Sequence, residues 1–197
     1  MKPENCAVFI LAAGLSTRFG ELDKLMTNLG DRPMLSHVID TVEPLALEAR
    51  FGVVPQTSKR RRALLLQAGF QVIENPTPET GVGSSIILAG QRALEEGFEA
   101  ICILLGDMPF IAPSHIDGLI EALYDEDSAA SVCDETIMPP IALRRSLLPD
   151  IAAISPQAGA KALLKGENTA YIPLSNQAAQ DIDDPETLAW LNAKMGW

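Results

Sequence analysis

Residues 11–24 combine small side chains with two cationic ones, which is the composition of a phosphate-binding loop. The segment reads LAAGLSTRFGELDK. Small residues at positions 12–14 let a ligand approach the backbone closely, where free amide N–H groups can bind phosphate oxygens. Arg18 and Lys24 can neutralise phosphate charge. These residue types are consistent with triphosphate binding, and a glycine turn flanked by two solvated cations is the alternative.

Neither of the standard phosphate motifs is present in this segment. A dinucleotide fingerprint requires GxGxxG at the start of a helix, and a Walker A loop requires GxxxxGK followed by Ser or Thr. Here Gly14 and Gly20 are separated by five residues, and the lysine follows only at position 24. The missing GxGxxG argues against a nicotinamide-dependent dehydrogenase.

Asp107 is a candidate metal ligand because it follows the apolar run 101–106, ICILLG. That position is the carboxyl end of a predicted strand, where ligands of open α/β sheets bind. Magnesium is held by few carboxylates together with phosphate oxygens, so one well-placed aspartate can anchor it. The alternative is an aspartate that caps a turn ahead of Pro109.

The segment 181–185, DIDDP, adds three carboxylates close together. Asp184 directly precedes a proline that can open a helix, so we predict that it is the N-cap. Asp181 and Asp183 alternate in an extended segment and therefore share a face. One or both can complete a metal site, and a solvated acidic loop is the alternative.

A glycine turn at 81–83 leads into Ser84 and Ser85 and then into an apolar helical stretch. The start of a helix offers free amide donors to a ligand. The simpler explanation is a helix start that needs glycine for its backbone conformation.

Strands and helices alternate along most of the chain, which indicates a mostly parallel sheet with helices on both sides. The expected strands are 6–13, 49–54, 71–75, 99–105, 128–133, 139–143 and 170–174, and the expected helices are 33–43, 57–68, 84–96, 113–124, 157–165 and 185–194. We therefore predict a three-layer α/β, Rossmann-like fold with a small mixed C-terminal extension. No linker-like segment interrupts the chain, so we expect residues 1–197 to form a single domain.

Composition excludes some partners and leaves others open. The formal net charge of −11 and the acidic pI do not fit a nucleic-acid-binding surface. The apolar run near the N-terminus is too short to span a membrane and lacks a signal-peptide cleavage pattern. Three cysteines without CxxC spacing are expected to be buried, reduced thiols. We expect a soluble, cytoplasmic protein.

Two further features receive no catalytic role. The basic run 59–62, KRRR, is expected to form a solvated helix face or a partner contact, although it could steer an anionic substrate. His37 and His115 have neither a neighbouring serine–acid pair nor metal-ligand spacing, so both are expected to be structural.

The motifs together resemble the molybdopterin nucleotidyltransferase family, and most of all its molybdenum cofactor cytidylyltransferase branch. Residues 11–24 resemble the pattern LAAGxSxRxGxxK, with three residues instead of two between Gly20 and Lys24. The similarity continues, in the family's order, through TGVGSS at 80–85, LGDMPF at 105–110, GAKALL at 159–164 and DIDDPE at 181–186. Guanylyltransferases of the family usually carry two glycines where this chain has Ala13 and Gly14, so the resemblance favours cytidine over guanosine.

The resemblance implies a transfer of CMP from CTP to the phosphate of molybdopterin, with Mg²⁺ as cofactor and release of pyrophosphate. Arg18, Lys24 and Asp107 would be the catalytic residues, and Asp107 and Asp183 would hold the metal. The implied nucleotide contacts are Leu11, Ala12, Ala13, Gly14, Arg18, Lys24, Asn75, Gly83 and Ser84. A molybdoenzyme client is an expected further partner.

The chain departs from the family pattern on the side expected to hold the acceptor. A Gly-x-Pro segment is replaced by Ile137, Met138 and two prolines, and the usual Gly-Asp pair before Gly159 is absent. The alternatives are therefore a guanylyltransferase using GTP, transfer to another phosphorylated acceptor, or a molybdenum cofactor carrier without turnover.

Overall fold

Seven strands form one sheet in the order β5-β4-β1-β6-β8-β7-β9. The computed structural model describes residues 5–164 and 168–196. In chain order the elements are β1 (Cys6–Leu11), η1 (Thr17–Phe19), η2 (Lys24–Met26), β2 (Asn28–Leu29), β3 (Arg32–Pro33), α1 (Met34–Val42), β4 (Ala49–Pro55), α2 (Lys59–Gln67), β5 (Gln71–Asn75), η3 (Pro78–Thr80), α3 (Val82–Glu96), β6 (Ala100–Leu105), α4 (Pro113–Ala122), β7 (Ser128–Cys133), β8 (Thr136–Arg144), η4 (Arg145–Ala153), η5 (Ala160–Leu163), β9 (Thr169–Pro173) and α5 (Pro185–Met195).

The sheet is mostly parallel, as predicted. β1 pairs in parallel with β4 and β6, and β5 and β9 also pair in parallel with their neighbours. Only β8 runs against the strands on either side of it. The expected C-terminal extension is therefore mixed, and β7, β8 and β9 extend the same sheet.

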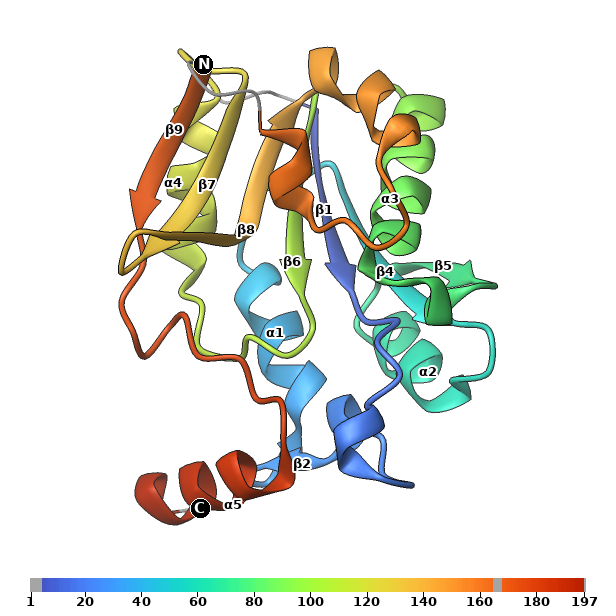
Figure 1. Ribbon diagram of the computed structural model, residues 1–197, viewed down its shortest axis with the longest axis vertical. Helices are drawn as coiled ribbons and strands as arrows, with labels where there is room; N and C mark the ends of the chain where they lie inside the picture. The colour runs from blue at the N-terminus through green and yellow to red at the C-terminus, as the bar shows by residue number, and fades with distance from the viewer. Residues whose placement is uncertain (1–4, 165–167, 197) are drawn as a thin grey trace.

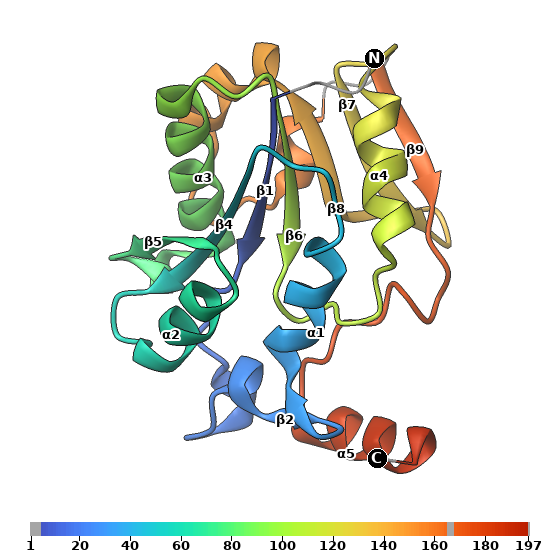
Figure 2. The same ribbon diagram turned by 180° about the vertical axis from the view of Figure 1, so that it is seen from behind.

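Helices cover both faces of the sheet, which confirms the three-layer fold. α1, α2 and α4 lie on one face, and α3 lies on the other with η4 and η5 (Figures 1 and 2). β1 is apolar throughout because both of its faces are buried. Val8 and Ile10 lie in the core under α1 and α4, whereas Phe9 and Leu11 lie in the core under α3. A strand buried on both faces requires such a continuous apolar run.

The predicted helix at 157–165 is wrong. Only the single turn of η5 forms, and residue 165 lies outside the described residues. Gly159 has an extended backbone (φ −80°, ψ 170°), and the Ala158 amide closes a turn on the Ser155 carbonyl at 2.8 Å. An extended residue at this point prevents a continuous helix, although the apolar spacing resembles that of one.

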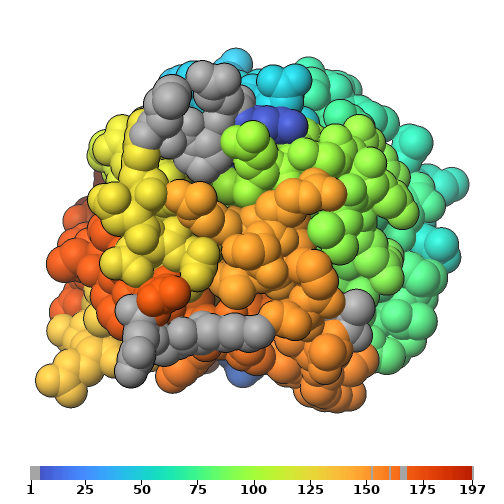
Figure 3. Space-filling model, turned by 90° about the horizontal axis from the view of Figure 1, so that it is seen from above, coloured from blue at the N-terminus to red at the C-terminus, as the bar shows by residue number. Residues whose placement is uncertain are grey.

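The segment η4 packs against α3 at the end of the molecule where β1 begins. Seen from above, the orange segment that contains η4 lies beside the green segment that contains α3 (Figure 3). Pro149 lies inside η4 and has no N–H to donate, which is consistent with 3₁₀ turns in place of a continuous α-helix.

The C-terminal helix α5 lies apart from these layers, beside β2 (Figure 1). Its Asn192 side chain accepts a hydrogen bond from the Gly30 amide at 2.8 Å and donates to the Asn28 carbonyl at 3.3 Å. Because α5 follows residues 181–184 directly, these contacts also hold the acidic segment at this end of the sheet.

Two of the three cysteines are buried as expected, and the structural role of the two histidines stays a prediction. Cys6 and Cys102 are buried and Cys133 is half-buried, and none of the three is in a disulfide. The His115 ring lies 2.8 Å from the Ser131 hydroxyl, and the His37 ring lies 2.8 Å from the Leu29 carbonyl. Within the described residues, no helix is both long and apolar enough to cross a membrane.

Gly83 allows α3 to approach the chain that precedes η5. A Cβ at Gly83 would lie 2.4 Å from the Ser155 carbonyl oxygen and 2.7 Å from that of Pro156. Gly83→Ala is therefore expected to destabilise the fold by about 1–3 kcal/mol, because backbone must move to admit the methyl group. Denaturant unfolding monitored by circular dichroism measures this change.

Gly118→Ala is the matched control for that variant. A Cβ at Gly118, within α4, would have nothing within 4 Å. The same substitution there is expected to stabilise the fold by about 0.5–1 kcal/mol, through the helix preference of alanine. Equal effects at the two glycines would contradict the close packing at Gly83.

Candidate active site

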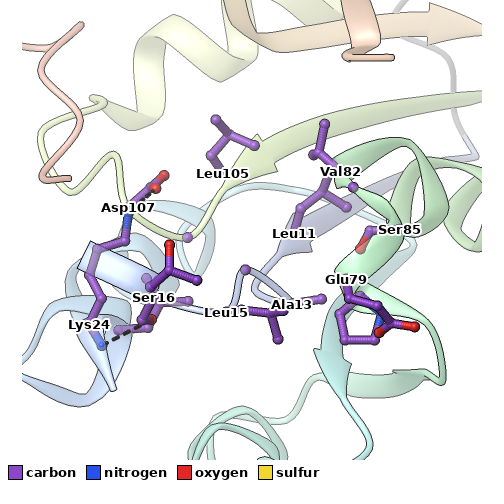
Figure 4. A pocket seen from close by; sticks show the side chains of 16 residues that line it. Leu11, Ala13, Leu15, Ser16, Lys24, Glu79, Val82, Ser85, Leu105 and Asp107 are labelled. Atoms are coloured by element: carbon purple, nitrogen blue, oxygen red, sulfur yellow. Dashed lines mark hydrogen bonds and ion pairs between the residues drawn. The ribbon is translucent and has the colours of Figure 1, made fainter. Parts of the chain in front are cut away.

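The candidate site is a cavity of about 440 Å³ at the carboxyl ends of β1 and β6. Lys24 and Asp107 lie on one side of it and Glu79 and Ser85 on the other, with Ala13 between them (Figure 4). The residues that line it are Leu11, Ala13, Gly14, Leu15, Ser16, Thr17, Lys24, Leu25, Pro78, Glu79, Gly81, Val82, Ser85, Leu105, Gly106 and Asp107. The loop that follows β1, the glycine turn at 81–83 and the turn that contains Asp107 all contribute to it.

Parallel pairing of β1 with β6 brings the first loop and Asp107 together. Leu11 pairs with Leu105, and the Gly106 amide donates to the Leu11 carbonyl at 3.0 Å. A Cβ at Gly106 would lie 3.1 Å from the Leu25 side chain and 3.3 Å from the Leu11 carbonyl oxygen, so a larger residue would require these neighbours to shift. Asp107 therefore leaves β6 directly beside the segment that carries Lys24.

Lys24 joins two carboxylates that are far away in the sequence. Its ammonium nitrogen Nζ lies 2.6 Å from Asp107 Oδ2 and 2.9 Å from Asp183 Oδ1. Arg18 binds the other oxygen of Asp183 at 2.5 Å. Arg18 and Asp183 also line a smaller, open cavity that continues from Lys24. The structure thus brings Arg18, Lys24, Asp107 and Asp183 into one charged cluster.

The cluster favours the charged forms of its members. Burial alone would lower the pKa of Lys24, but the Asp107 charge, together with hydrogen bonds to both carboxylates, raises it. The hydrogen bond from Lys24 is the main reason that the pKa of Asp183 is lowered. Lys24 is therefore a cation and Asp183 an anion at neutral pH.

Asp181 differs from Asp183 in its electrostatics. Burial raises the pKa of Asp181, and the charges of Asp183 and Asp107 raise it further. The Ile182 amide, between the two acids, donates to the Asp107 carbonyl at 3.3 Å and so anchors the segment beside β6. Of the two candidates, Asp183 is the one that shares Lys24 with Asp107.

Asp184 is the N-cap of α5, as predicted. Its carboxylate accepts from the Thr187 amide at 2.7 Å and from the Thr187 hydroxyl at 3.0 Å. These hydrogen bonds lower the pKa of Asp184, which is the usual consequence of stabilising a carboxylate at a helix start.

The donor set fits a divalent cation that is shared with a substrate. Asp107 Oδ1 is buried and has no hydrogen-bond partner among the described residues, so it remains available as a ligand. Within residues 5–164 and 168–196, no three His, Cys, Asp or Glu side chains are grouped to hold a metal by themselves. A magnesium ion bound through one or two carboxylates would take its remaining ligands from phosphate and water.

The expectation that residues 59–62 form a solvated face is wrong for Arg61. Arg61 is 3% exposed, whereas Arg60 and Arg62 are exposed. Its guanidinium pairs with Asp23 at 2.7 Å and donates to the carbonyls of Ala12 and Gly14 at 2.7 and 2.8 Å. Charge runs predict exposed faces because burying one cation requires a specific set of partners that the run does not reveal.

Four predicted nucleotide contacts lie behind the cavity wall instead of lining it. Ala12 is fully buried, with its carbonyl on Arg61. Asn75 is 1% exposed and donates to the hydroxyls of Ser84 and Ser85 at 2.8 and 3.0 Å, which ties β5 to the start of α3. Gly83 faces the Ser155–Pro156 backbone. Direct nucleotide contact by Ala12, Asn75, Gly83 and Ser84 stays a prediction.

Several lining residues were not predicted, although they belong to the recognised motifs. Leu15 and Val82, which line the cavity, are 49% and 41% exposed, and Ser85 follows the predicted Ser84. In the sequence, the only sign of their role was an apolar residue directly beside a glycine, as at Leu15 and Val82. Their exposure, which is typical of a ligand-binding surface, is visible only in the structure.

The comparison with protein families decides the assignment. A model described as the MobA-like NTP transferase domain matches residues 8–173. The chain belongs to this family. The match includes the first loop and Asp107, and it ends before the acidic segment 181–184.

Two curated relatives cover part of the chain. The bifunctional protein GlmU of Symbiobacterium thermophilum is 32% identical over 139 residues, which are 70% of this chain and 29% of GlmU. A probable molybdenum cofactor guanylyltransferase of Pyrococcus horikoshii is 31% identical over 123 residues, 62% of this chain and 59% of that protein. The matched segment thus spans less than a third of GlmU and about three fifths of the second relative.

Solved structures share the fold at low sequence identity. Rv0371c of Mycobacterium tuberculosis in complex with manganese has a TM-score of 0.76 and 18% identity, over 95% of this chain and 97% of that one. The molybdopterin-guanine dinucleotide biosynthesis protein A of Archaeoglobus fulgidus has a TM-score of 0.72 and 17% identity, over 96% and 98% of the two chains. A CMP:2-keto-3-deoxy-manno-octonic acid synthetase with CTP has a TM-score of 0.74 and 14% identity, over 98% of each chain.

Asp181→Asn is expected to stabilise the fold at neutral pH. The pKa of Asp181 is raised above its unfolded value, so the wild type loses stability as the pH rises through the folded pKa. Asparagine does not titrate and avoids this loss. The difference in thermal midpoint between variant and wild type should therefore increase between about pH 3.5 and pH 7.

Asp184→Asn is the control, with the opposite sign. The pKa of Asp184 is lowered, so its charge contributes stability that is present above the unfolded pKa and is lost as the pH falls through the folded pKa. This variant should lose stability relative to the wild type at pH 7. Parallel pH profiles for the two variants would contradict the electrostatic difference between Asp181 and Asp184.

Proposed function

We propose that this protein is a nucleotidyltransferase that moves CMP from CTP to the phosphate of a molybdopterin-type acceptor bearing molybdenum. The observation that carries the proposal is the cluster in which Lys24 binds Asp107 and Asp183, at the edge of a cavity lined by the loop 13–17. Cations, open backbone amides and a buried free carboxylate oxygen are what a triphosphate with its metal requires.

The reaction needs no strong base in the protein. An acceptor phosphate oxygen attacks the α-phosphorus of CTP, a new P–O–P bond forms, and the bond to the β-phosphate breaks to release pyrophosphate. A phosphate monoester has a second pKa of about 6 and is already largely ionised near neutral pH. The protein must therefore bring two anions together and align them, which is mainly a matter of charge and position.

Lys24 and Arg18 supply the positive charge for this step. Lys24 is 12% exposed, so its charge is little screened by water, whereas Arg18 is 68% exposed and can move to a ligand. Both are already held by Asp183, which keeps them beside the loop before a nucleotide arrives. We assign them to the triphosphate and to the departing pyrophosphate.

Asp107 and Asp183 would hold a divalent metal, for which we propose Mg²⁺. The free Oδ1 of Asp107 supports this assignment, as does the manganese complex of the mycobacterial protein with the same fold. When bound, the metal would neutralise phosphate charge as it develops in the reaction.

The choice of CTP rests on Ala13 and Gly14, where guanylyltransferases of the family usually carry two glycines. The synthetase that binds CTP on the same fold supports cytidine. The Pyrococcus relative favours GTP as the second candidate. Together with the Archaeoglobus protein, it supports a molybdopterin-type acceptor.

Isothermal calorimetry with CTP and GTP, each with and without Mg²⁺, separates the candidates, and metal-dependent preference for CTP is expected.

Other outcomes of the titration would change the proposal. Preference for GTP would make the protein a guanylyltransferase. Failure to bind either nucleotide would contradict nucleotidyl transfer and leave the carrier role. Pyrophosphate release that depends on the acceptor would exclude a carrier without turnover.

Lys24→Ala and Asp107→Ala are each expected to lower turnover by at least about 100-fold, because they remove charge that the transition state requires. Pyrophosphate release measured at saturating CTP tests this, with circular dichroism to confirm folding. Glu79→Gln is the control, since it removes a charge at the opposite side of the cavity. Near wild-type turnover in either alanine variant would remove that residue from the mechanism.

A further inference from the structure

Arg61 has more hydrogen-bond partners in the first loop than any other side chain described in the site. Its Nε contacts both carboxylate oxygens of Asp23 at 2.9 and 3.0 Å. One terminal nitrogen donates to the carbonyls of Ala12 and Gly14, and the other donates to the Ser16 hydroxyl at 3.2 Å. One guanidinium on α2 thus binds four positions of a loop that lies more than thirty-five residues earlier in the chain.

Arg61 cannot itself serve as a phosphate ligand in this arrangement. It contributes to a second, open cavity on the α2 side of the loop but does not line the main cavity, it is only 3% exposed, and its donors are taken by the loop. Removing a cation from water is costly unless partners replace the lost hydration, and here Asp23 and two carbonyls replace it. The contacts therefore act on the shape of the loop.

The two carbonyl contacts determine where the loop amides point. In a trans peptide the C=O and the following N–H point in opposite directions. With the Ala12 and Gly14 carbonyls on Arg61, the amides of Ala13 and Leu15 are directed to the other side of the loop. Ala13 and Leu15 line the main cavity, and no acceptor within the described residues receives a hydrogen bond from either amide. Two open donors thus face the cavity.

Arg61 also acts on the backbone of Lys24. The Ser16 hydroxyl, which Arg61 contacts, accepts a hydrogen bond from the Lys24 amide at 3.1 Å, as the dashed line in Figure 4 shows. Asp23 accepts from the Leu25 amide at 3.1 Å and caps the turn η2, in which Lys24 is the first residue. Both ends of the loop are therefore connected to one buried cation.

We propose that Arg61 is a positioning residue for phosphate binding: it orients the Ala13 and Leu15 amides toward the cavity and sets the backbone from which Lys24 reaches the phosphates. The inference rests on the proposed function and adds a residue outside the loop to it. Lysine cannot replace this arginine, because a single ammonium group does not span Asp23, both carbonyls and the Ser16 hydroxyl.

The test uses Arg61→Lys and inorganic tripolyphosphate, a probe that does not depend on the base or the acceptor. In the wild type, tripolyphosphate with Mg²⁺ should shift the amide NMR signals of Ala13 and Leu15. In Arg61→Lys the affinity should fall by about 10- to 100-fold and those shifts should be lost. Arg62→Lys is the matched control, because Arg62 is an exposed neighbour whose ion pair with Glu74, at 3.3 Å, is also exposed.

Two outcomes separate this inference from the proposed function. If the wild type does not bind tripolyphosphate, both are overturned. If the wild type binds it and Arg61→Lys binds equally well with the same amide shifts, only the role of Arg61 is overturned. A loss of affinity in Arg62→Lys equal to that in Arg61→Lys would also contradict a role specific to Arg61.

Chemical rescue distinguishes positioning from a general loss of structure. Arg61→Ala should bind tripolyphosphate weakly, and millimolar guanidinium should restore the affinity at least partly, whereas tetramethylammonium should not. If Arg61→Ala does not fold, Asp23→Asn is tested in its place. This variant weakens the ion pair between Asp23 and Arg61 but keeps the arginine side chain. Unchanged affinity in folded Asp23→Asn, or a folded Arg61→Ala that guanidinium does not rescue, would overturn the proposal.

Discussion

Parallel pairing of β1 with β6 determines where the charged groups of the site lie. The two strands end at the same edge of the sheet, with Leu11 opposite Leu105, so the loop that follows β1 and the turn that contains Asp107 begin side by side. The Lys24 contact with Asp107 depends on this pairing, because the residues are 83 positions apart. Asp183 joins them from a third segment, held in place by the Ile182 contact and by the cap of α5.

Two buried or half-buried cations have different roles at this edge. Lys24 balances carboxylates that face the cavity, so its partners can change when an anion binds. Arg61 balances Asp23 and backbone carbonyls behind the loop, so its contacts are part of the fold. A loop rich in small residues has few side-chain contacts that could fix its conformation. Hydrogen bonds from the Arg61 guanidinium to the loop fix it instead.

Much of the fold could be predicted from the sequence, because strand and helix periods are local properties. The buried strand β1 and the cap at Asp184 are examples. Motif positions and the family resemblance indicated Arg18, Lys24, Asp107 and Asp183 as separate candidates, but not the ion pairs that join them. The helix expected at 157–165 did not form, since apolar spacing does not reveal the extended backbone at Gly159. The burial of Arg61 could not be predicted, because its partners are 38 to 49 residues away and only the fold brings them together.

The central claim is that the loop at residues 13–17 and the Lys24–Asp107 pair form one triphosphate site. A crystal structure of the protein with Mg²⁺ and a non-hydrolysable CTP analogue tests it most directly. The account predicts phosphate oxygens on the Ala13 and Leu15 amides, with a metal about 2.1 Å from an oxygen of Asp107. A triphosphate bound away from this loop, or a metal that Asp107 does not touch, would contradict it.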